Sequence, residues 1–169
     1  MTTTLVTERL RLEPCGMDHH DGLCVVNRDP EVMRYIGGRP QTAEETRAWI
    51  GRAETRWTDL GYSWWAIRPA ATGEIVGACC LQHIENDPVQ ELEIGWRLLP
   101  AHWGRGYATE AARAMIGFGF QELGAPRLFS IADPRNTASI RVMQRLGMRS
   151  LGLRRHYGTD AATYVLDRP

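Results

Sequence analysis

The sequence predicts a mixed α/β fold in one domain that spans residues 1–169. The chain has 169 residues, a length that suits a single domain with a sizeable core. Hydrophobic residues make up 43% and charged residues 24%, which is typical of globular proteins. Segments of alternating apolar residues are interspersed with segments of helical periodicity, and no linker, repeat or low-complexity stretch interrupts them.

The N-terminal part predicts a strand followed by short helices. Leu10 and Leu12 alternate with charged residues, which indicates a strand, and Pro14 ends it. Residues 17–36 predict one or two short helices that are broken around Asp29-Pro30.

A longer helix is predicted after these. Thr42 followed by Glu45 forms a capping box, which marks the helix start. Gly61 ends the helix. Apolar residues repeat between these limits at helical spacing: Trp49, Ile50, Ala53, Trp57 and Leu60.

Three strands are predicted next, over residues 62–68, 75–84 and 91–98. The third has the clearest alternation and is stopped by Pro100. One of its faces is apolar and the other mostly polar: Leu92, Ile94, Trp96 and Leu98 against Glu91, Glu93, Gly95 and Arg97.

The C-terminal part predicts alternating helices and strands. A helix is expected over about 106–123 and a strand over 128–132. Asn136 would cap a further helix that ends at Gly147, and two strands joined by a turn at 158–160 complete the chain.

The charge balance excludes several classes of protein. The net charge is zero, which argues against a nucleic-acid partner. All 20 basic residues are arginine, so neither a Schiff-base lysine nor a Walker-type phosphate loop is available.

The cysteines and the hydropathy favour a soluble cytoplasmic protein with no metal site. Cys15, Cys24, Cys79 and Cys80 include no CxxC pair, and a reduced setting suits them. The sequence shows neither an N-terminal apolar segment of signal-peptide length nor an 18-residue apolar run, so no membrane partner is expected.

Residues 93–109, EIGWRLLPAHWGRGYAT, suggest an anion-binding loop between a strand and a helix. Gly104 and Gly106 let the main chain approach a ligand, and the following helix start suits a pyrophosphate. The Thr109 hydroxyl would add a donor. A plain connecting turn remains open, but a dinucleotide fingerprint is disfavoured because Thr109 stands where that pattern needs Gly or Ala.

The run EIGWRLLPAHWGRGYATEAARAMIGFGF closely resembles the acetyl-CoA-binding motif of the GNAT superfamily of N-acetyltransferases. In that family a six-residue pattern cradles the cofactor pyrophosphate. Its positions here are Trp103, Gly104, Arg105, Gly106, Tyr107 and Ala108. Trp103 stands where Gln or Arg is usual, a variant typical of the RimJ/RimL branch.

A second block, NTASIRVMQRLGM, also resembles that branch, and supporting pieces occur at Thr7 to Leu12 and Thr42 to Ile50. The resemblance therefore covers most of the chain. It implies a mixed, mostly antiparallel sheet of about six or seven strands flanked by helices, with a splayed strand pair that holds acetyl-CoA.

The resemblance also implies a set of cofactor-binding residues. The strand before the glycine loop would hold the pantetheine arm, and a main-chain N–H near Trp96 or Arg97 would stabilise the oxyanion. A bulge at Gly95 would help, although packing explains that glycine equally well. The expected cofactor contacts are Trp96, Arg97, Leu98, Thr109 and Asn136, together with the six motif residues.

Glu93 is the candidate general base, because it lies on the polar face of that strand. Glu91 shares the face, so the two like charges would raise one pKa. Alternatively both carboxylates are solvated or pair with Arg97. Three other groups could reach an acceptor, although surface or packing roles explain each of them better: Tyr35, His83 and His156.

Ser139 is the candidate acid for the thiolate, by resemblance to the RimJ/RimL branch. The tyrosine that many superfamily members use falls here at Met143. Ser139 also suits the first turn of a helix in its own right. Asn136 would contact the pantetheine arm or cap that helix.

The expected activity is transfer of an acetyl group from acetyl-CoA to an amine, either a protein N-terminus or a small molecule. A module of the same fold that binds acyl-CoA without turnover is the alternative. One tryptophan of the Trp64-Trp65 pair would be buried; the other would either line the acceptor cleft or, as is better supported, pack in the core. The final strands offer an edge at which two copies would form a homodimer.

Overall fold

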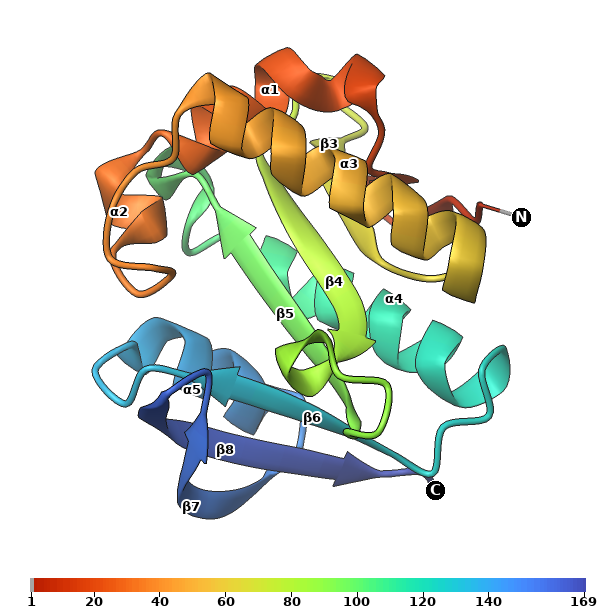
Figure 1. The fold of residues 1–169 in the computed structure, drawn as a ribbon. Coiled ribbons are helices and arrows are strands. Elements are labelled where there is room, and N and C mark those ends of the chain that lie inside the picture. The colour runs from red at the N-terminus through yellow and green to blue at the C-terminus, as the bar shows by residue number, and fades with distance from the viewer. Residues whose placement is uncertain (1) are drawn as a thin grey trace.

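A computed structural model describes residues 2–169. Its centre is an eight-stranded sheet in the order β1-β2-β3-β4-β5-β6-β8-β7, and its only parallel pair in this range is β5–β6 (Figure 1). The strands are β1 Leu5–Val6, β2 Leu10–Pro14, β3 Trp64–Pro69, β4 Gly77–His83, β5 Leu92–Leu98, β6 Arg127–Ala132, β7 Arg149–His156 and β8 Thr159–Asp167. The mostly antiparallel sheet is confirmed. The expected number of strands was too low, because the two-residue β1 is too short to show alternation.

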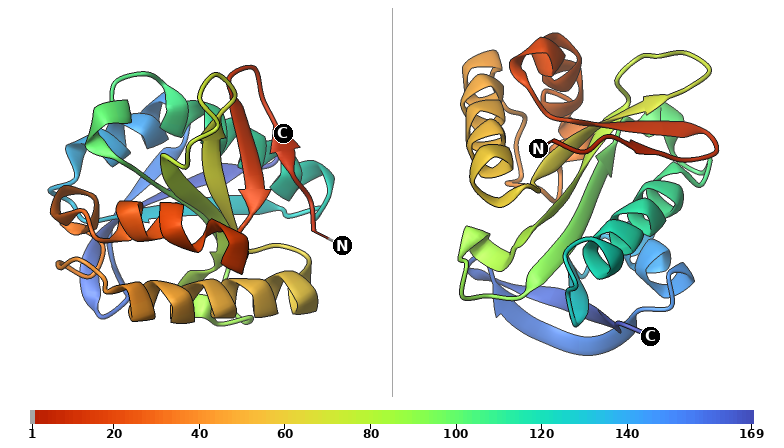
Figure 2. Two further views of the ribbon diagram at one scale, coloured as in Figure 1. Left: turned by 90° about the horizontal axis from the view of Figure 1, so that it is seen from above. Right: turned by 90° about the vertical axis from the view of Figure 1, so that its right-hand side faces the viewer.

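Helices cover both faces of this sheet (Figure 2). They are α1 His20–Asn27, α2 Pro30–Met33, α3 Ala43–Leu60, α4 Tyr107–Gln121 and α5 Thr137–Arg145, with short 3-10 turns at Met17–His19, Ile84–Asn86 and Pro100–His102. α1 and α3 pack on one face, and α4 and α5 on the other.

The local signals for α3 are confirmed in detail. The Thr42 hydroxyl accepts from the Glu45 N–H at 3.1 Å, and the Glu45 carboxylate accepts from the Thr42 N–H at 2.8 Å. Gly61 ends the helix in the left-handed region, with φ of 79°. These contacts satisfy groups that a helix end leaves free, so the sequence alone was sufficient to place this helix.

The Trp64-Trp65 pair shows how the two faces of the sheet are filled. Trp65 is fully buried, and its ring packs edge-on against Phe118 of α4 and against Trp57 near the C-terminal end of α3. Trp64 is buried on the other face, where it packs edge-on against Trp49 of α3. Of the two readings for the second tryptophan, packing in the core is therefore correct and lining an open cleft is wrong, because α3 covers Trp64.

The sheet divides between β5 and β6. Glu93 and Phe129 are the one pair in register, and the Ser130 hydroxyl donates to the Ile94 carbonyl at 3.1 Å just beyond it. From there the two strands separate toward their C-terminal ends (Figure 1). The expected splayed pair is thus present, and its open end lies beside the start of α4.

Candidate active site

The main chain of β5 opens onto the gap at Trp96. The Ile94 carbonyl faces β6, and the Leu98 carbonyl accepts from Trp103 Nε1 at 2.8 Å on the side away from β4. Because a strand has a period of two, the N–H and C=O of Trp96 face the same gap. The Arg97 carbonyl lies against Gly77 of β4 instead. Of the two expected main-chain donors, Trp96 has the suitable direction and Arg97 does not.

No bulge interrupts the pairing of β5 with β4. The register runs without a shift from Gly77 opposite Leu98 to His83 opposite Leu92. A Cβ placed at Gly95 would lie 3.2 Å from the Cys80 sulfur. Of the two readings of Gly95, the bulge is wrong, and the glycine instead makes room for a neighbouring side chain.

The main chain of the glycine loop has a geometry that lets a ligand approach it closely. Gly104 and Gly106 have φ of 71° and 78°, a region that glycine adopts without strain. Gly106 is the N-cap of α4 and has no side chain to bond the first turn. The N–H groups of that turn are therefore free to bind an anion.

A cavity of about 570 Å³ lies between this loop, the end of β5, α2 and α5. Ten of the eleven expected cofactor residues line it: Trp96, Arg97, Leu98, Trp103, Gly104, Gly106, Tyr107, Ala108, Thr109 and Asn136. Arg105 is outside the lining. The Thr109 hydroxyl is buried in the cavity wall and has no hydrogen-bond partner among residues 2–169. An elongated ligand that carries a pyrophosphate fits this lining.

Glu93 is buried, with 6% of its surface exposed, outside the cavity lining on the N-terminal half of β5. Its carboxylate accepts from the Tyr157 hydroxyl and from Gln82 Nε2, the latter at 3.2 Å. Burial raises the pKa of Glu93 to about 7, although both hydrogen bonds oppose the rise. A carboxyl with this pKa exchanges protons readily at neutral pH.

The neighbours expected for Glu93 were wrong. Glu91 is exposed and does not contribute to the pKa of Glu93; the smaller like-charge effect comes from Glu85. Arg97 is not its partner either, because the carboxylate is bonded to Tyr157 and Gln82. The polar face of β5 is covered by other elements rather than by solvent, which strand periodicity cannot reveal.

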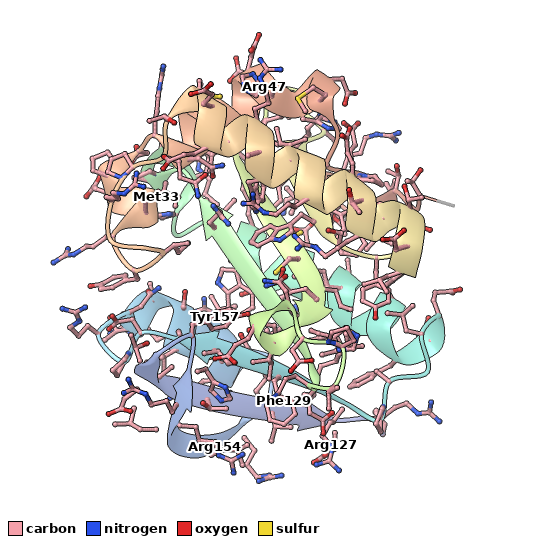
Figure 3. The ribbon with its side chains drawn as sticks, in the orientation of Figure 1. Met33, Arg47, Arg127, Phe129, Arg154 and Tyr157 are labelled. Atoms are coloured by element: carbon pink, nitrogen blue, oxygen red, sulfur yellow. The ribbon has the colours of Figure 1, made fainter. Side chains whose placement is uncertain are left out.

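Tyr157 is a site residue that the sequence did not single out. It reaches from the β7–β8 turn toward β5 (Figure 3), and burial raises its pKa, so the phenol stays protonated and donates. Its own N–H donates to Glu85 at 2.5 Å. Tyr157, Glu85 and Asn86 have φ of 52°, 58° and 56°, an unusual region for residues other than glycine. Such strain often accompanies function.

Arg97 forms an aromatic and polar contact on the α1–α3 side. Its guanidinium lies 4.5 Å from the ring centre of Trp64 and 5.0 Å from that of Trp49. One of its nitrogens donates to Asn27 at 2.9 Å. Burial lowers the pKa of Arg97 to about 10, so it stays charged. Its side chain therefore joins α1, α3 and β3 to the back of β5.

The start of α5 faces the same cavity. The Asn136 side chain accepts from the Ser139 N–H at 3.2 Å, which confirms the predicted cap. Ser139 and Asn136 both line the cavity. Met143 lies on the buried face of α5 and takes no part in the lining.

The three other candidate groups lie apart from one another. Tyr35 lines the cavity mouth, where the guanidinium groups of Arg34 and Arg135 lie within 6 Å of its ring. His83 bonds the Tyr62 hydroxyl at 2.9 Å and the Gln90 carbonyl at 2.7 Å. His156 Nε2 is buried without a partner in the described part of the chain.

Over residues 2–169, no group of three or more metal-ligating side chains is close enough together to hold an ion, and the four cysteines are free. None of the helices described here has the length and apolarity needed to span a bilayer.

A mixed sheet that splays beside a glycine loop, with a buried carboxyl on the splayed strand, suits a group-transfer enzyme whose donor carries a pyrophosphate. The model of the acetyltransferase (GNAT) domain family matches residues 9–149. YkkB of Bacillus subtilis is 37% identical over 96% of this chain and 94% of its own length. YnaD, an uncharacterized N-acetyltransferase of Bacillus subtilis, is 43% identical over 88% of this chain and 84% of its own length.

The crystal structure of an acetyltransferase from Agrobacterium tumefaciens has the same fold. It is 30% identical, with a TM-score of 0.86, over 99% of this chain and 96% of that one. This chain belongs to the GNAT acetyltransferase family. It is an N-acetyltransferase, and acetyl-CoA is its cosubstrate.

Proposed function

We propose that the enzyme transfers the acetyl group to a primary amine, on a protein N-terminus or a small molecule, by direct attack in a ternary complex. One observation carries the proposal. A buried carboxyl, with a pKa of about 7, lies on the strand whose main chain opens onto the cavity.

The cofactor is proposed to lie along β5 and the glycine loop. The free N–H groups at the start of α4 and the Thr109 hydroxyl would bind its pyrophosphate. The Trp96 main chain would bind the pantetheine arm and donate to the acetyl carbonyl oxygen as negative charge develops there. Asn136 and the walls around Leu98 and Trp103 would keep water from the arm.

Glu93 is the proposed general base. An amine attacks only in its neutral form, and most amines are protonated at neutral pH. The Glu93 carboxylate would take that proton, directly or through a water molecule. Tyr157 and Gln82 orient the carboxylate and favour its ionised form.

Ser139 is proposed to supply a proton to the leaving thiolate. It lies in the first turn of α5, in the cavity wall. Because its N–H is bonded to Asn136, the helix cap holds the main chain of Ser139 in place.

The acceptor class is proposed from the resemblance to the RimJ/RimL branch, which Trp103 and the Asn136–Ser139 block support. Peptides that begin with Ala or Ser are the first acceptors to test. The whole chain is proposed to act as one acetyltransferase domain.

Calorimetric titration with acetyl-CoA, with NADH as the control ligand, tests the cofactor site. We expect one-site binding of acetyl-CoA alone. Release of free thiol is then measured with Ala- and Ser-terminated peptides and a panel of small amines. Binding without release for any amine would favour the acyl-CoA-binding module over the enzyme.

Glu93→Gln tests the base. The amide keeps the shape but cannot take up the proton, so we expect kcat to fall by roughly 10²–10⁴-fold. The wild-type rate should rise with pH through about 7, where Glu93 ionises, and this step should be absent in the variant. Glu91→Gln is the matched control, because Glu91 is exposed just before β5 and should leave the rate unchanged.

A further inference from the structure

The N-terminal hairpin reaches the start of α4 through Arg9. The Arg9 Nε donates to the Glu110 carboxylate at 2.7 Å, and its Nη2 lies 2.7 Å from the same oxygen. The Arg9 N–H and the Thr7 hydroxyl donate to the other oxygen, at 2.8 Å and 2.6 Å. One carboxylate in the first turn of α4 therefore holds a whole segment that is a hundred residues distant in sequence.

The same guanidinium also supports the glycine loop from behind. Its Nη1 donates to the Arg105 carbonyl at 2.7 Å, and its central carbon lies 4.9 Å from the ring centre of Tyr107. A Cβ at Gly106 would come within 3.3 Å of Arg9 Nη2. Arg9 thus touches each residue from Arg105 to Tyr107, yet it does not line the cavity.

Peptide geometry links these contacts to the cavity. In a trans peptide the C=O of one residue and the N–H of the next point in opposite directions. Because Arg9 fixes the Arg105 carbonyl on the back of the loop, the Gly106 N–H must point to the other side. Gly106 lines the cavity there, where the Thr109 hydroxyl is also buried without a partner.

The charges around the loop also indicate that Arg9 supports pyrophosphate binding. Glu110 places a carboxylate in the first turn of α4, where it would repel a bound pyrophosphate. The Arg9 guanidinium compensates that charge without entering the site. Removing Arg9 would both free the loop and expose the phosphates to Glu110.

We propose that Arg9 and Glu110 form a positioning pair that orients the Gly106 N–H for the coenzyme A pyrophosphate and cancels the repulsion by Glu110. The proposal rests on the placement of the cofactor given above. It also gives the Thr7 to Leu12 segment a role in cofactor binding, although that segment lies far from the glycine loop in sequence.

The test compares coenzyme A with pantetheine, which lacks the pyrophosphate together with the 3′-phosphoadenosine attached to it. Coenzyme A affinity is measured by calorimetry, and pantetheine affinity by ligand-detected NMR, for wild type, Arg9→Gln and Arg9→Lys. We expect Arg9→Gln to weaken coenzyme A by roughly tenfold or more, since a charge-assisted contact is lost. Pantetheine, which lacks the pyrophosphate, should change by less than about twofold. Arg9→Lys keeps the charge but not the forked geometry and should fall between.

Arg11→Gln is the matched control, because Arg11 lies only two residues further along, in β2, and pairs with Glu13 at 2.8 Å, away from the loop. It should leave the affinity for coenzyme A unchanged. Equal losses for both ligands in Arg9→Gln would show general damage to the fold and overturn the proposal, as would an unchanged coenzyme A affinity. If wild type bound coenzyme A no more tightly than pantetheine, the proposed cofactor placement itself would be wrong.

Discussion

At the scale of single residues, burial decides which carboxylate is ready for chemistry. Glu93 and Glu91 share one strand face in the sequence, yet one is buried beneath Tyr157 and the other is exposed. Burial disfavours the charged form of Glu93, and two hydrogen bonds only partly restore it. As a result, Glu93 titrates near neutral pH, where a base is needed to deprotonate an amine acceptor.

Tyr157→Phe should shift the pH dependence of the rate. The phenol donates to the Glu93 carboxylate and lowers its pKa, so removing the hydroxyl should move the rise in kcat to higher pH, on the order of one pH unit. The pH profile of thiol release measures this shift. Tyr62→Phe is the control, because the Tyr62 hydroxyl bonds His83 and not Glu93. A profile that stayed in place would show that the phenol does not tune the base.

At the scale of elements, the glycine loop and the start of α4 act as one unit. The two left-handed glycines turn the chain, and the helix that follows presents unbonded N–H groups to the cavity. Arg9 holds the back of this unit, although it belongs to β1–β2 rather than to the loop. A site on such a support is held more firmly than a site on the loop alone.

Gly106→Ala tests whether strain in the glycine loop weakens acetyl-CoA binding in addition to lowering stability. An alanine in the left-handed region is destabilised by about 1–2 kcal/mol, and its Cβ would also press on Arg9. We expect a matching loss in the free energy of unfolding together with several-fold weaker acetyl-CoA binding. Gly124→Ala is the control: φ there is 64°, the space is open and Gly124 does not line the cavity. It should lose similar stability and no affinity. Equal affinity losses in both would show that the loop has no special role.

Thr42→Ala should weaken α3 alone. The variant loses the bond from the cap to the Glu45 N–H, which is worth about 1 kcal/mol in the free energy of unfolding. Denaturant titration measures that loss, and kcat per folded molecule should stay constant. Thr58→Ala removes an exposed hydroxyl that bonds only the Glu54 carbonyl, and it should have a smaller effect. A loss of kcat in Thr42→Ala would mean that α3 has a part in the chemistry.

At the scale of the whole molecule, the split in the sheet gives the enzyme its cavity. Between β5 and β6 pairing stops after Glu93 and Phe129, so main-chain groups that would bond a neighbouring strand face the gap instead. α4 packs against both β5 and β6 and so joins the two halves of the sheet beside that gap. Buried polar groups without partners would be costly, and a bound ligand would satisfy them.

The raised pKa of Glu93 should make the stability of the whole fold depend on pH. Glu93 has a pKa of about 7 when folded and 4.5 as its ordinary value. Between these values the unfolded chain releases the proton while the folded chain keeps it, so stability falls as pH rises through this window. The loss from Glu93 is on the order of 3 kcal/mol and should level off above pH 7. Denaturant titrations of Glu93→Gln should lack this component, whereas Glu91→Gln should keep it. An identical slope in wild type and Glu93→Gln would refute the raised pKa.

The sequence by itself was sufficient where the signal is local. The capping box of α3, the glycines before α4 and the Asn136 cap of α5 each depend on residues within a few positions of one another, and the structure confirms all three as local structures. Alternation also identified the strand that carries Glu93. The cavity lining followed from the resemblance, because that motif describes a continuous stretch.

Only the tertiary structure decided what depends on contacts between distant segments. Tyr157 lies 64 residues from Glu93, and Arg9 lies 101 residues from Glu110. Neither pair leaves a periodic pattern in the sequence, since spacing along the chain says nothing of which turns meet in space. Burial of the polar face of β5 was hidden for the same reason: alternation shows that two faces differ, and packing determines which of them meets water.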